Sequence, residues 1–328
     1  MKLNKIKIMI SLAVCALIVL TGCSNEAEAS NKEKVYKIGI SQLIEHPSLD
    51  QAREGFIEEM KNLGVNVDVN YLNAQGEPVS AQTIAEKFVK DKVDLIYSIA
   101  TLSTQTARKA TENSNTPVVF SSVTDPVYSD IVSNINALEN ITGVSDKVDV
   151  GEILALAKEL KEGASVVGII YNTGESNSEV QVNEVKEAAK NLGMTIETVG
   201  ITTVNDIPQA LNTLAKKIDV LYVIGDNIVA SAISLVANLC IENNIITLSS
   251  IESQAADGIL MGNGLNYYEH GKQAARMAKR ILADGEGVKD VEIEYPSSIN
   301  KIVNLKTMEA LGLSKDNKAF EGAEFIGE

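Results

Sequence analysis

The chain has 328 residues, more than a single hydrophobic core usually supports, so two lobes are expected. Its 44 acidic residues outnumber 29 basic ones and give a net charge of −15, which argues against a nucleic-acid partner because phosphate binding needs basic patches. The two histidines, His46 and His270, are far apart in sequence and only three cysteines occur, so neither a metal site nor a cofactor is expected.

The first 22 residues have the pattern of a secretory signal. Three lysines among the first seven residues precede an apolar stretch over residues 8–20, which is shorter than the roughly 20 residues of a membrane span. The stretch ends in Leu20-Thr21-Gly22-Cys23, which resembles the lipobox of bacterial lipoproteins. The resemblance implies that residues 1–22 are removed, that Cys23 carries the lipid, and that residues 23–34 form a flexible tether.

From residue 35 onward, apolar strand-like runs alternate with amphipathic helices. The strands expected in chain order span residues 35–40, 65–72, 93–99, 117–120, 165–171, 194–199, 220–224, 245–248, 258–261, 291–295 and 299–303. The helices expected between them span residues 49–63, 79–89, 101–112, 148–160, 179–192, 207–217, 228–242, 267–282 and 305–311. This alternation predicts an α/β fold.

The scheme recurs on either side of residues 142–149, which predicts two doubly wound parallel-sheet lobes joined by a hinge near residues 143–148. Lobe 1 is expected to comprise residues 35–145 plus 265–295, and lobe 2 residues 146–264 plus 296–328. Cys240 falls inside a predicted helix of lobe 2 and has no remaining cysteine to pair with, so no intrachain disulfide is expected.

Open parallel sheets bind their ligands beyond the carboxyl ends of the strands. The loops at these ends are rich in hydroxyl, amide and acidic side chains, and they span residues 41–46, 100–103, 121–126, 172–178, 225–227 and 249–252. Two such rims that face each other predict a polar cleft between the lobes. No glycine-rich phosphate loop, nucleophile elbow or distinctive carboxylate pair is present in the sequence, so binding without catalysis is expected and a hydrolase is a minor alternative.

Several of these loops together resemble one family. The segments that carry the resemblance are Ile40-Ser41-Gln42, Glu45-His46-Pro47, Ser98-Ile99-Ala100-Thr101, Phe120-Ser121-Ser122-Val123-Thr124-Asp125-Pro126, Thr142-Gly143-Val144-Ser145-Asp146, Tyr171-Asn172, Glu175-Ser176-Asn177-Ser178 and Asp226-Asn227. They are similar to the tryptophan/tyrosine-type substrate-binding lipoproteins of ABC transporters, which have the type I periplasmic-binding-protein fold. The resemblance implies an amino-acid ligand, expected to be tyrosine, tryptophan or phenylalanine, captured by hinge closure.

It also implies an extracytoplasmic, lipid-anchored monomer that serves an ABC permease and ATPase, with no other membrane contact. The alternative with the same fold is a surface-displayed adhesin or sensory receptor. A transcriptional repressor core also shares the fold, but the signal and the lipobox-like segment argue against it.

The loops are more distantly similar to those of branched-chain amino-acid binding proteins. That similarity assigns the ligand's carboxylate to Thr101, a bridging role to Thr124 and the ammonium to Asp226. A buried zwitterion needs a partner for each of its charges, which suits these side chains. Further candidate ligand-binding residues in the same loops are Ser122, Asp125, Asn177, Ser178 and Asn227, followed by Glu45, His46 and Tyr71.

Each assignment has a structural alternative. Thr101 is also a candidate helix N-cap, as are Asp226 or Asn227 for helix 228–242, and Asn177 and Ser178 for helix 179–192. Thr124 is also suited to ordering the turn before Pro126, and Glu45 and His46 to tying their loop to the hinge. An aromatic ligand needs an apolar or stacking wall, for which the candidates are Tyr71, Tyr128, Tyr171 and Tyr267.

Overall fold

The computed structural model describes residues 34–135 and 138–327. The predicted signal, the lipidation site Cys23 and nearly all of the predicted tether lie outside these residues. Within the described ranges, no helix is long and apolar enough to cross a membrane.

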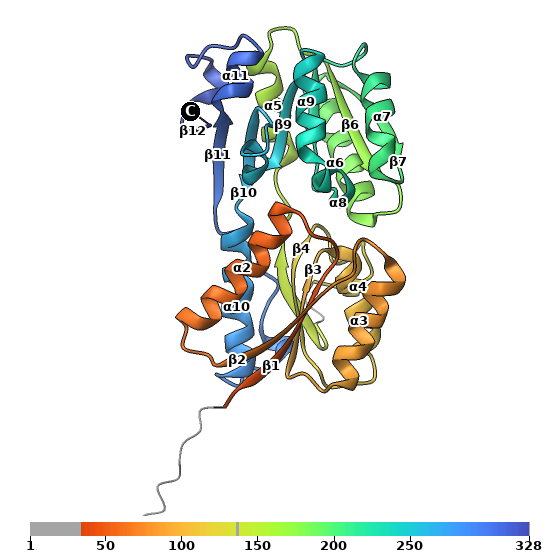
Figure 1. Cartoon of the computed structure of the whole chain (residues 1–328), viewed down its shortest axis with the longest axis vertical. Helices are drawn as coiled ribbons and strands as arrows, with labels where there is room; N and C mark the ends of the chain where they lie inside the picture. Colours follow the sequence, from red (N-terminus) through yellow and green to blue (C-terminus); the bar gives the residue numbers. More distant parts are fainter. Residues whose placement is uncertain (1–33, 136–137, 328) are drawn as a thin grey trace, which may run out of the picture. The chain divides into compact units, whose positions relative to one another are not determined.

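A five-stranded parallel sheet forms the centre of the half of the molecule that we call lobe 1. Its order is β2-β1-β3-β4-β5. The strands are β1 (Tyr36–Gln42), β2 (Val67–Asn73), β3 (Leu95–Ile99), β4 (Val118–Val123) and β5 (Ile141–Ser145). Helices α3 (Pro78–Lys90) and α4 (Thr101–Thr111) cover one face, and α2 (Pro47–Asn62) and α10 (Tyr267–Leu282) cover the other (Figure 1). Strands β3 and β4 are buried along their whole length, as their continuous apolar sequences predict.

Helix α10 comes from late in the chain and is held in lobe 1 by close packing against α2. A Cβ atom on Gly55 would lie 2.0 Å from the carbonyl oxygen of Tyr268, and one on Gly271 would lie 1.9 Å from that of Ala52. Glycine at both positions lets the two backbones approach each other closely. This contact fixes the start of α10, which borders the site described below.

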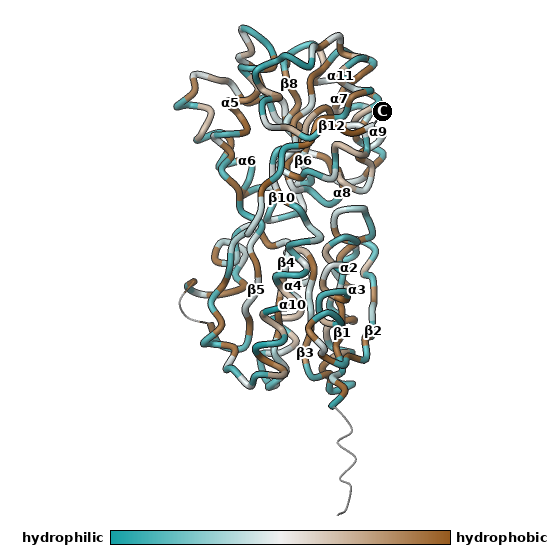
Figure 2. The backbone as a smooth tube through the Cα atoms, turned by 90° about the vertical axis from the view of Figure 1, so that its left-hand side faces the viewer, coloured by the Kyte–Doolittle hydropathy of each residue, from teal (hydrophilic) through white to brown (hydrophobic). Residues whose placement is uncertain are grey.

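A seven-stranded sheet forms the centre of the other half, which we call lobe 2. Its order is β12-β11-β10-β9-β8-β6-β7, and only the β10–β11 pair in the described chain is antiparallel. The strands are β6 (Val166–Asn172), β7 (Thr195–Ile201), β8 (Val220–Val223), β9 (Ile246–Ile251), β10 (Met261–Leu265), β11 (Ile299–Asn304) and β12 (Glu324–Ile326). In Figure 2 the hydrophobic colour follows buried strands such as β8.

Two separate apolar clusters cover the two faces of this sheet. Helices α5 (Val150–Leu160), α6 (Ser176–Leu192) and α11 (Leu305–Ala310) contribute to one cluster, and α7 (Ile207–Leu214), α8 (Asn227–Ser231) and α9 (Ile233–Glu242) to the other. Short 3₁₀ helices span Val204–Asp206, Glu252–Ala255, Val288–Asp290 and Lys318–Phe320. The predicted α/β class with two helix-covered sheets is therefore confirmed.

Several predicted elements differ from the structure. Strands β5 and β12 were not expected; β5 is short and contains Gly143, where a Cβ would lie 2.3 Å from the carbonyl oxygen of Phe120. The predicted strand over residues 291–295 is only a single bridge, between Val144 and Glu294. The predicted helix 228–242 is two helices, because Ala232 leaves the helical conformation. Lobe 2 is not wholly parallel, since β11 runs back beside β10 after the chain has passed through lobe 1.

The chain passes between the two sheets three times, after β5, after β10 and before β11. The hydroxyl of Tyr267, which follows β10, donates to Asp146 Oδ2 after β5 at 2.7 Å. Backbone bonds from Ser145 N–H to the Glu294 carbonyl and from Glu294 N–H to the Gly143 carbonyl join the first and third passages. The predicted hinge at residues 143–148 contains the first of these passages, and its action as a hinge stays a prediction. The predicted residue boundaries of the lobes also stay a prediction.

Candidate ligand-binding cleft

The rims of the two lobes meet around one cavity. Lobe 1 and the passages between the lobes supply His46, Leu49, Ser122, Thr124, Asp146 and Tyr267. Lobe 2 supplies Asn177, Gly225, Asp226, Asn227, Ala230 and Ile251. The cavity is narrow and has room for about one water molecule, so a larger ligand requires the rims to move apart.

The rims are joined by polar contacts at four places and by Ile251 of lobe 2, which belongs to the buried apolar cluster of lobe 1. His46 Nε2 lies 3.3 Å from Asn227 Oδ1, and the hydroxyl oxygens of Ser48 and Ser253 are 3.3 Å apart. The hydroxyl oxygens of Ser129 and Ser176 are 3.4 Å apart, and Gln181 Nε2 donates to Thr124 Oγ1 at 3.5 Å. Each of these distances is at the long end of the hydrogen-bonding range, where the bond is weak. These polar contacts therefore contribute little to holding the lobes together.

Six of the residues that the sequence singled out line the cavity: His46, Ser122, Thr124, Asn177, Asp226 and Asn227. Ser178 lies behind it, fully buried, and donates to Asp226 Oδ2 at 2.7 Å. Asn177 and Ser178 lie inside α6, whose N-cap is Glu175, so the capping alternative for these two residues is wrong.

Thr101, Asp125, Glu45 and Tyr71 do not line this cavity. Asp125 accepts hydrogen bonds from the backbone of the next turn and lies 4.0 Å from Lys147 Nζ. The Tyr71 hydroxyl donates to Glu45 at 3.0 Å, and burial together with this bond raises the pKa of Tyr71 to about 12. Glu45 and Tyr71 are therefore engaged with each other inside lobe 1, and their hydrogen bond links the loop after β1 to β2.

Hydroxyl groups without a partner collect on the rim of lobe 1. The Oγ atoms of Ser41, Ser103 and Ser122 and Oγ1 of Thr101 are buried and have no hydrogen-bond partner in the described part of the chain. Ser41 and Ser122 are the second-to-last residues of β1 and β4, and Thr101 and Ser103 follow the neighbouring strand β3. Thr101 is the first residue of α4 and Ala100 is its N-cap, so the capping alternative for Thr101 is wrong. Buried hydroxyls normally have partners, and this rim is therefore suited to a polar ligand group.

Asp226 is turned back into lobe 2. It is the N-cap of α8, where its Oδ1 accepts from Val229 N–H at 2.9 Å, which confirms its capping alternative. Its Oδ2 accepts from Asn172 N–H at 2.5 Å and from the Ser178 hydroxyl at 2.7 Å. Burial, reinforced by the neighbouring Glu175, raises the pKa of Asp226 above its usual range.

Glu175 was not identified as a site residue, although it lies in one of the rim loops. Its Oε2 accepts from the side-chain amide of Asn227 at 2.6 Å and from that of Asn177 at 3.1 Å. The amide oxygen of Asn227 consequently faces His46, so that His46 Nε2–H is the donor and Nδ1 carries a lone pair. Burial lowers the pKa of His46 to about 4, which keeps the ring neutral near pH 7. That Nδ1 atom is buried without a partner among the described residues.

Asp146 was also missed as a site residue, although it ends one of the segments that carried the family resemblance. While Oδ2 accepts from Tyr267, its Oδ1 is buried and has no hydrogen-bond partner in the residues described. Of the four tyrosines proposed as an aromatic wall, Tyr267 lines the cavity, and Tyr71, Tyr128 and Tyr171 do not. Its ring is buried beside Leu49 and Ile251, which give the cavity an apolar side.

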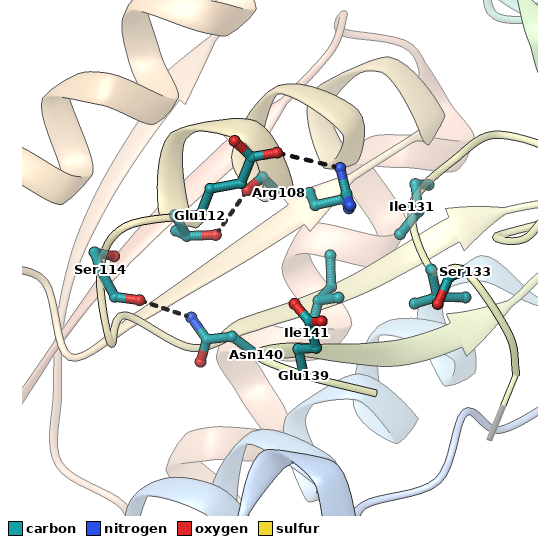
Figure 3. Close-up of a pocket in the computed structure, with 10 residues that line it drawn as sticks. Arg108, Glu112, Ser114, Ile131, Ser133, Glu139, Asn140 and Ile141 are labelled. Carbon is teal, nitrogen blue, oxygen red and sulfur yellow. Dashed lines mark hydrogen bonds and ion pairs between the residues drawn. The ribbon is translucent and has the colours of Figure 1, made fainter. Parts of the chain in front are cut away.

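A second cavity, larger than the one between the lobes, lies on lobe 1 (Figure 3). Its residues include Ser114 and Asn140, which precede β4 and β5, so it lies at the amino ends of these strands. Arg108 is paired there with Glu112 at 3.5 Å. Ligands of such sheets bind at the carboxyl ends, and the cavity between the lobes is therefore the candidate site.

Two α/β lobes with a polar cleft at their facing strand ends define the class of periplasmic binding proteins of the type I fold. Residues 37–324 match the family model described as ABC transporter substrate binding protein. A protein from Clostridioides difficile named tyrosine-binding protein is 37% identical over 327 residues, covering 96% of this chain and 94% of that protein. The chain therefore belongs to the ABC transporter substrate-binding proteins.

Two solved structures are informative about the lobes. A ligand-free, open structure of a substrate binding protein with adhesive properties from Clostridium difficile is 38% identical and covers 89% of this chain and 99% of its own, with a TM-score of 0.68. An ABC domain in complex with L-Trp from Streptococcus pneumonia is 26% identical and covers 90% of this chain and 100% of its own, with a TM-score of 0.84. Structural similarity thus runs opposite to sequence identity, as expected when lobes of one fold are rotated relative to each other.

Proposed function

We propose that this protein is the extracytoplasmic ligand-capturing component of an ABC importer and that its ligand is an amino acid with an aromatic side chain. The observation that carries the proposal is the cavity between the rims, which both lobes line with polar and apolar side chains. Its lining combines hydroxyl and carboxylate groups with the apolar side chains of Leu49 and Ile251 and the ring of Tyr267.

The polar groups suit the two charges of an amino acid. A ligand carboxylate needs hydroxyl and N–H donors, which the Ser122 and Thr124 rim supplies, with Thr101 at the start of α4 behind it. An ammonium group needs acceptors, and two carboxylates, Asp146 and Asp226, border the cavity. The roles predicted for Thr101 and Thr124 remain part of this proposal, and one of the two carboxylates is the partner of the ammonium group.

The aromatic side chain is supported by the apolar side of the cavity and by the relatives. One relative is named for tyrosine, and a neighbouring structure contains L-Trp. An aromatic ring gains stabilisation from packing against Tyr267 beyond the area that it buries. A ligand of this size does not fit between the rims as they stand, so binding includes their separation and renewed closure.

Closure follows from the division of the ligand contacts between two lobes. The full binding free energy is available only when both rims touch the ligand, so the ligand shifts the population toward the closed arrangement. The weak polar contacts between the rims leave this equilibrium to be set by the ligand. The closed form is then presented to the permease and ATPase, with the monomer held at the membrane through Cys23. The cleft supports ligand capture, and we do not adopt the alternative of a surface adhesin or sensory receptor.

The test is a thermal-shift screen of the purified protein against the twenty amino acids, followed by calorimetric titration. We expect tyrosine, tryptophan or phenylalanine to raise the melting temperature, because a ligand that binds only the folded state stabilises it. A screen in which no amino acid raises the melting temperature would refute the proposal, and stabilisation by aliphatic amino acids alone would refute its aromatic part.

A further inference from the structure

We propose that Asp146 receives the ammonium group of the ligand and that Asp226 serves the internal structure of lobe 2. The inference rests on the proposed function, in that it assumes an amino-acid ligand. It assigns a binding role to a residue in the passage between the lobes, outside the two rims on which the sequence placed the site.

Asp226 has little capacity left for a ligand. A carboxylate offers about four acceptor positions, and three donors already occupy those of Asp226. All three, on Asn172, Ser178 and Val229, belong to lobe 2 and remain in place when the lobes separate. The Asp226 side chain is also buried, at 1% exposure, so a ligand ammonium group has little access to it.

Asp146 has the opposite character. Asp146 lines the cavity, and its Oδ1 is buried and has no hydrogen-bond partner within the described ranges. The adjacent Lys147 does not neutralise it, because Lys147 Nζ is 2.6 Å from Glu184 and 4.0 Å from Asp125. A buried carboxylate oxygen without a donor is costly, and an ammonium N–H placed against it would remove that cost with a charge-assisted hydrogen bond.

The position of Asp146 connects the ligand to the passages between the lobes. Asp146 lies in the first passage, and its second oxygen accepts from Tyr267, the first residue of α10 after the second passage. Ser145, the residue directly before Asp146, donates its N–H to the carbonyl of Glu294 in the third passage. An ammonium group on Asp146 therefore touches the segment about which the lobes must turn. The expected ligand class is α-amino acids, with rejection of otherwise identical acids that lack the amino group.

The experiment measures dissociation constants for L-tyrosine and for 3-(4-hydroxyphenyl)propanoate, which lacks only the amino group. The proteins are wild type, Asp146→Asn, Asp226→Asn and the control Asp149→Asn. Asp149 is the exposed N-cap of α5 in the same passage, and asparagine caps a helix equally well. Wild type and Asp149→Asn should prefer L-tyrosine by at least about 30-fold, the loss typical of an unpaired buried charge.

In Asp146→Asn this preference should fall to about threefold or less, and the loss should come from weaker binding of L-tyrosine. Asp226→Asn should weaken both ligands alike and keep the preference. Asp146→Ser, with a smaller side chain, is the second variant if Asp146→Asn does not fold. A wild-type preference that persists in the Asp146 variant, or disappears in Asp226→Asn, would overturn this inference alone. No binding of L-tyrosine or any other amino acid by wild type would overturn the proposed function and the inference together.

Discussion

A cysteine pair across the cleft tests whether the lobes must part for the ligand to bind. Ser48 is the second residue of α2 in lobe 1, and Ser253 lies in the 3₁₀ helix after β9 in lobe 2. Their hydroxyl oxygens are 3.3 Å apart, and a disulfide needs its sulfur atoms at about 2.05 Å. The double variant Ser48→Cys/Ser253→Cys places two thiols where these hydroxyl groups already approach each other, and a disulfide between them would hold the rims together.

The expected stabilisation follows from the length of chain that the disulfide closes. The two positions are 205 residues apart, and the chain-entropy relation gives about 5 kcal/mol as the upper value for a loop of that size. Urea denaturation with and without reductant measures this difference. The single variants control for pairing with other cysteines of the chain, of which Cys240 is buried.

The effect on ligand binding is the decisive part. The cavity between the rims holds about one water molecule, so the oxidised protein should not bind L-tyrosine on the timescale on which the reduced protein does. Adding reductant should restore binding. Equal association rates in the oxidised and reduced protein would refute the reasoning, because the ligand would then reach its site without separation of the lobes. Failure of the two cysteines to pair would show that the rims do not meet in solution.

Three further predictions concern single residues. Asp226→Ala leaves the donors on Asn172, Ser178 and Val229 without their acceptor and should lower the free energy of unfolding by about 2–4 kcal/mol, as measured in urea; an unchanged value would contradict the network described for lobe 2. His46 has its pKa lowered by burial from 6.5 to about 4, so the folded state binds fewer protons than the unfolded state between these values, and stability is lost as the pH falls from about 6.5 to 4. Relative to His46→Gln, which shares every other titrating group, wild type should lose about 3 kcal/mol over this range, and parallel stability curves would argue that His46 is not buried in solution. Cys23→Ala should release the protein from membranes into the soluble fraction, and continued sedimentation with membranes would contradict lipidation.

The sequence predicted the fold from regular features of the chain. Alternation of apolar runs and amphipathic helices was sufficient because buried parallel strands are continuous in hydrophobicity, as in β8, and their helices have one apolar face. The elements that were missed lack these signals. Strand β5 is five residues long and interrupted by Gly143. Strand β11 was predicted as a strand, but its antiparallel direction depends on where the chain returns, which no local pattern encodes.

The site was predicted to the level of its loops, and less well to the level of atoms. The rule that ligands bind at the carboxyl ends of strands correctly predicted that Ser122, Thr124 and Asn227 line the cavity. The rule does not say which carboxylate is engaged internally. Asp226 is satisfied by backbone and hydroxyl donors far away in sequence, whereas Asp146 keeps an oxygen for the cavity because of where α10 places Tyr267. Such differences depend on tertiary contacts between residues up to 121 positions apart.

The central claim is that an amino acid binds between the lobes and draws them together. Its most direct test is the distance between spin labels attached at Val79→Cys in α3 and Leu235→Cys in α9, positions that are 77% and 39% exposed on lobes 1 and 2. With saturating L-tyrosine, the account predicts that a broad distance distribution narrows to a single population, while the protein labelled at both sites keeps its affinity. L-tyrosine that binds and leaves the distance distribution unchanged would contradict the account.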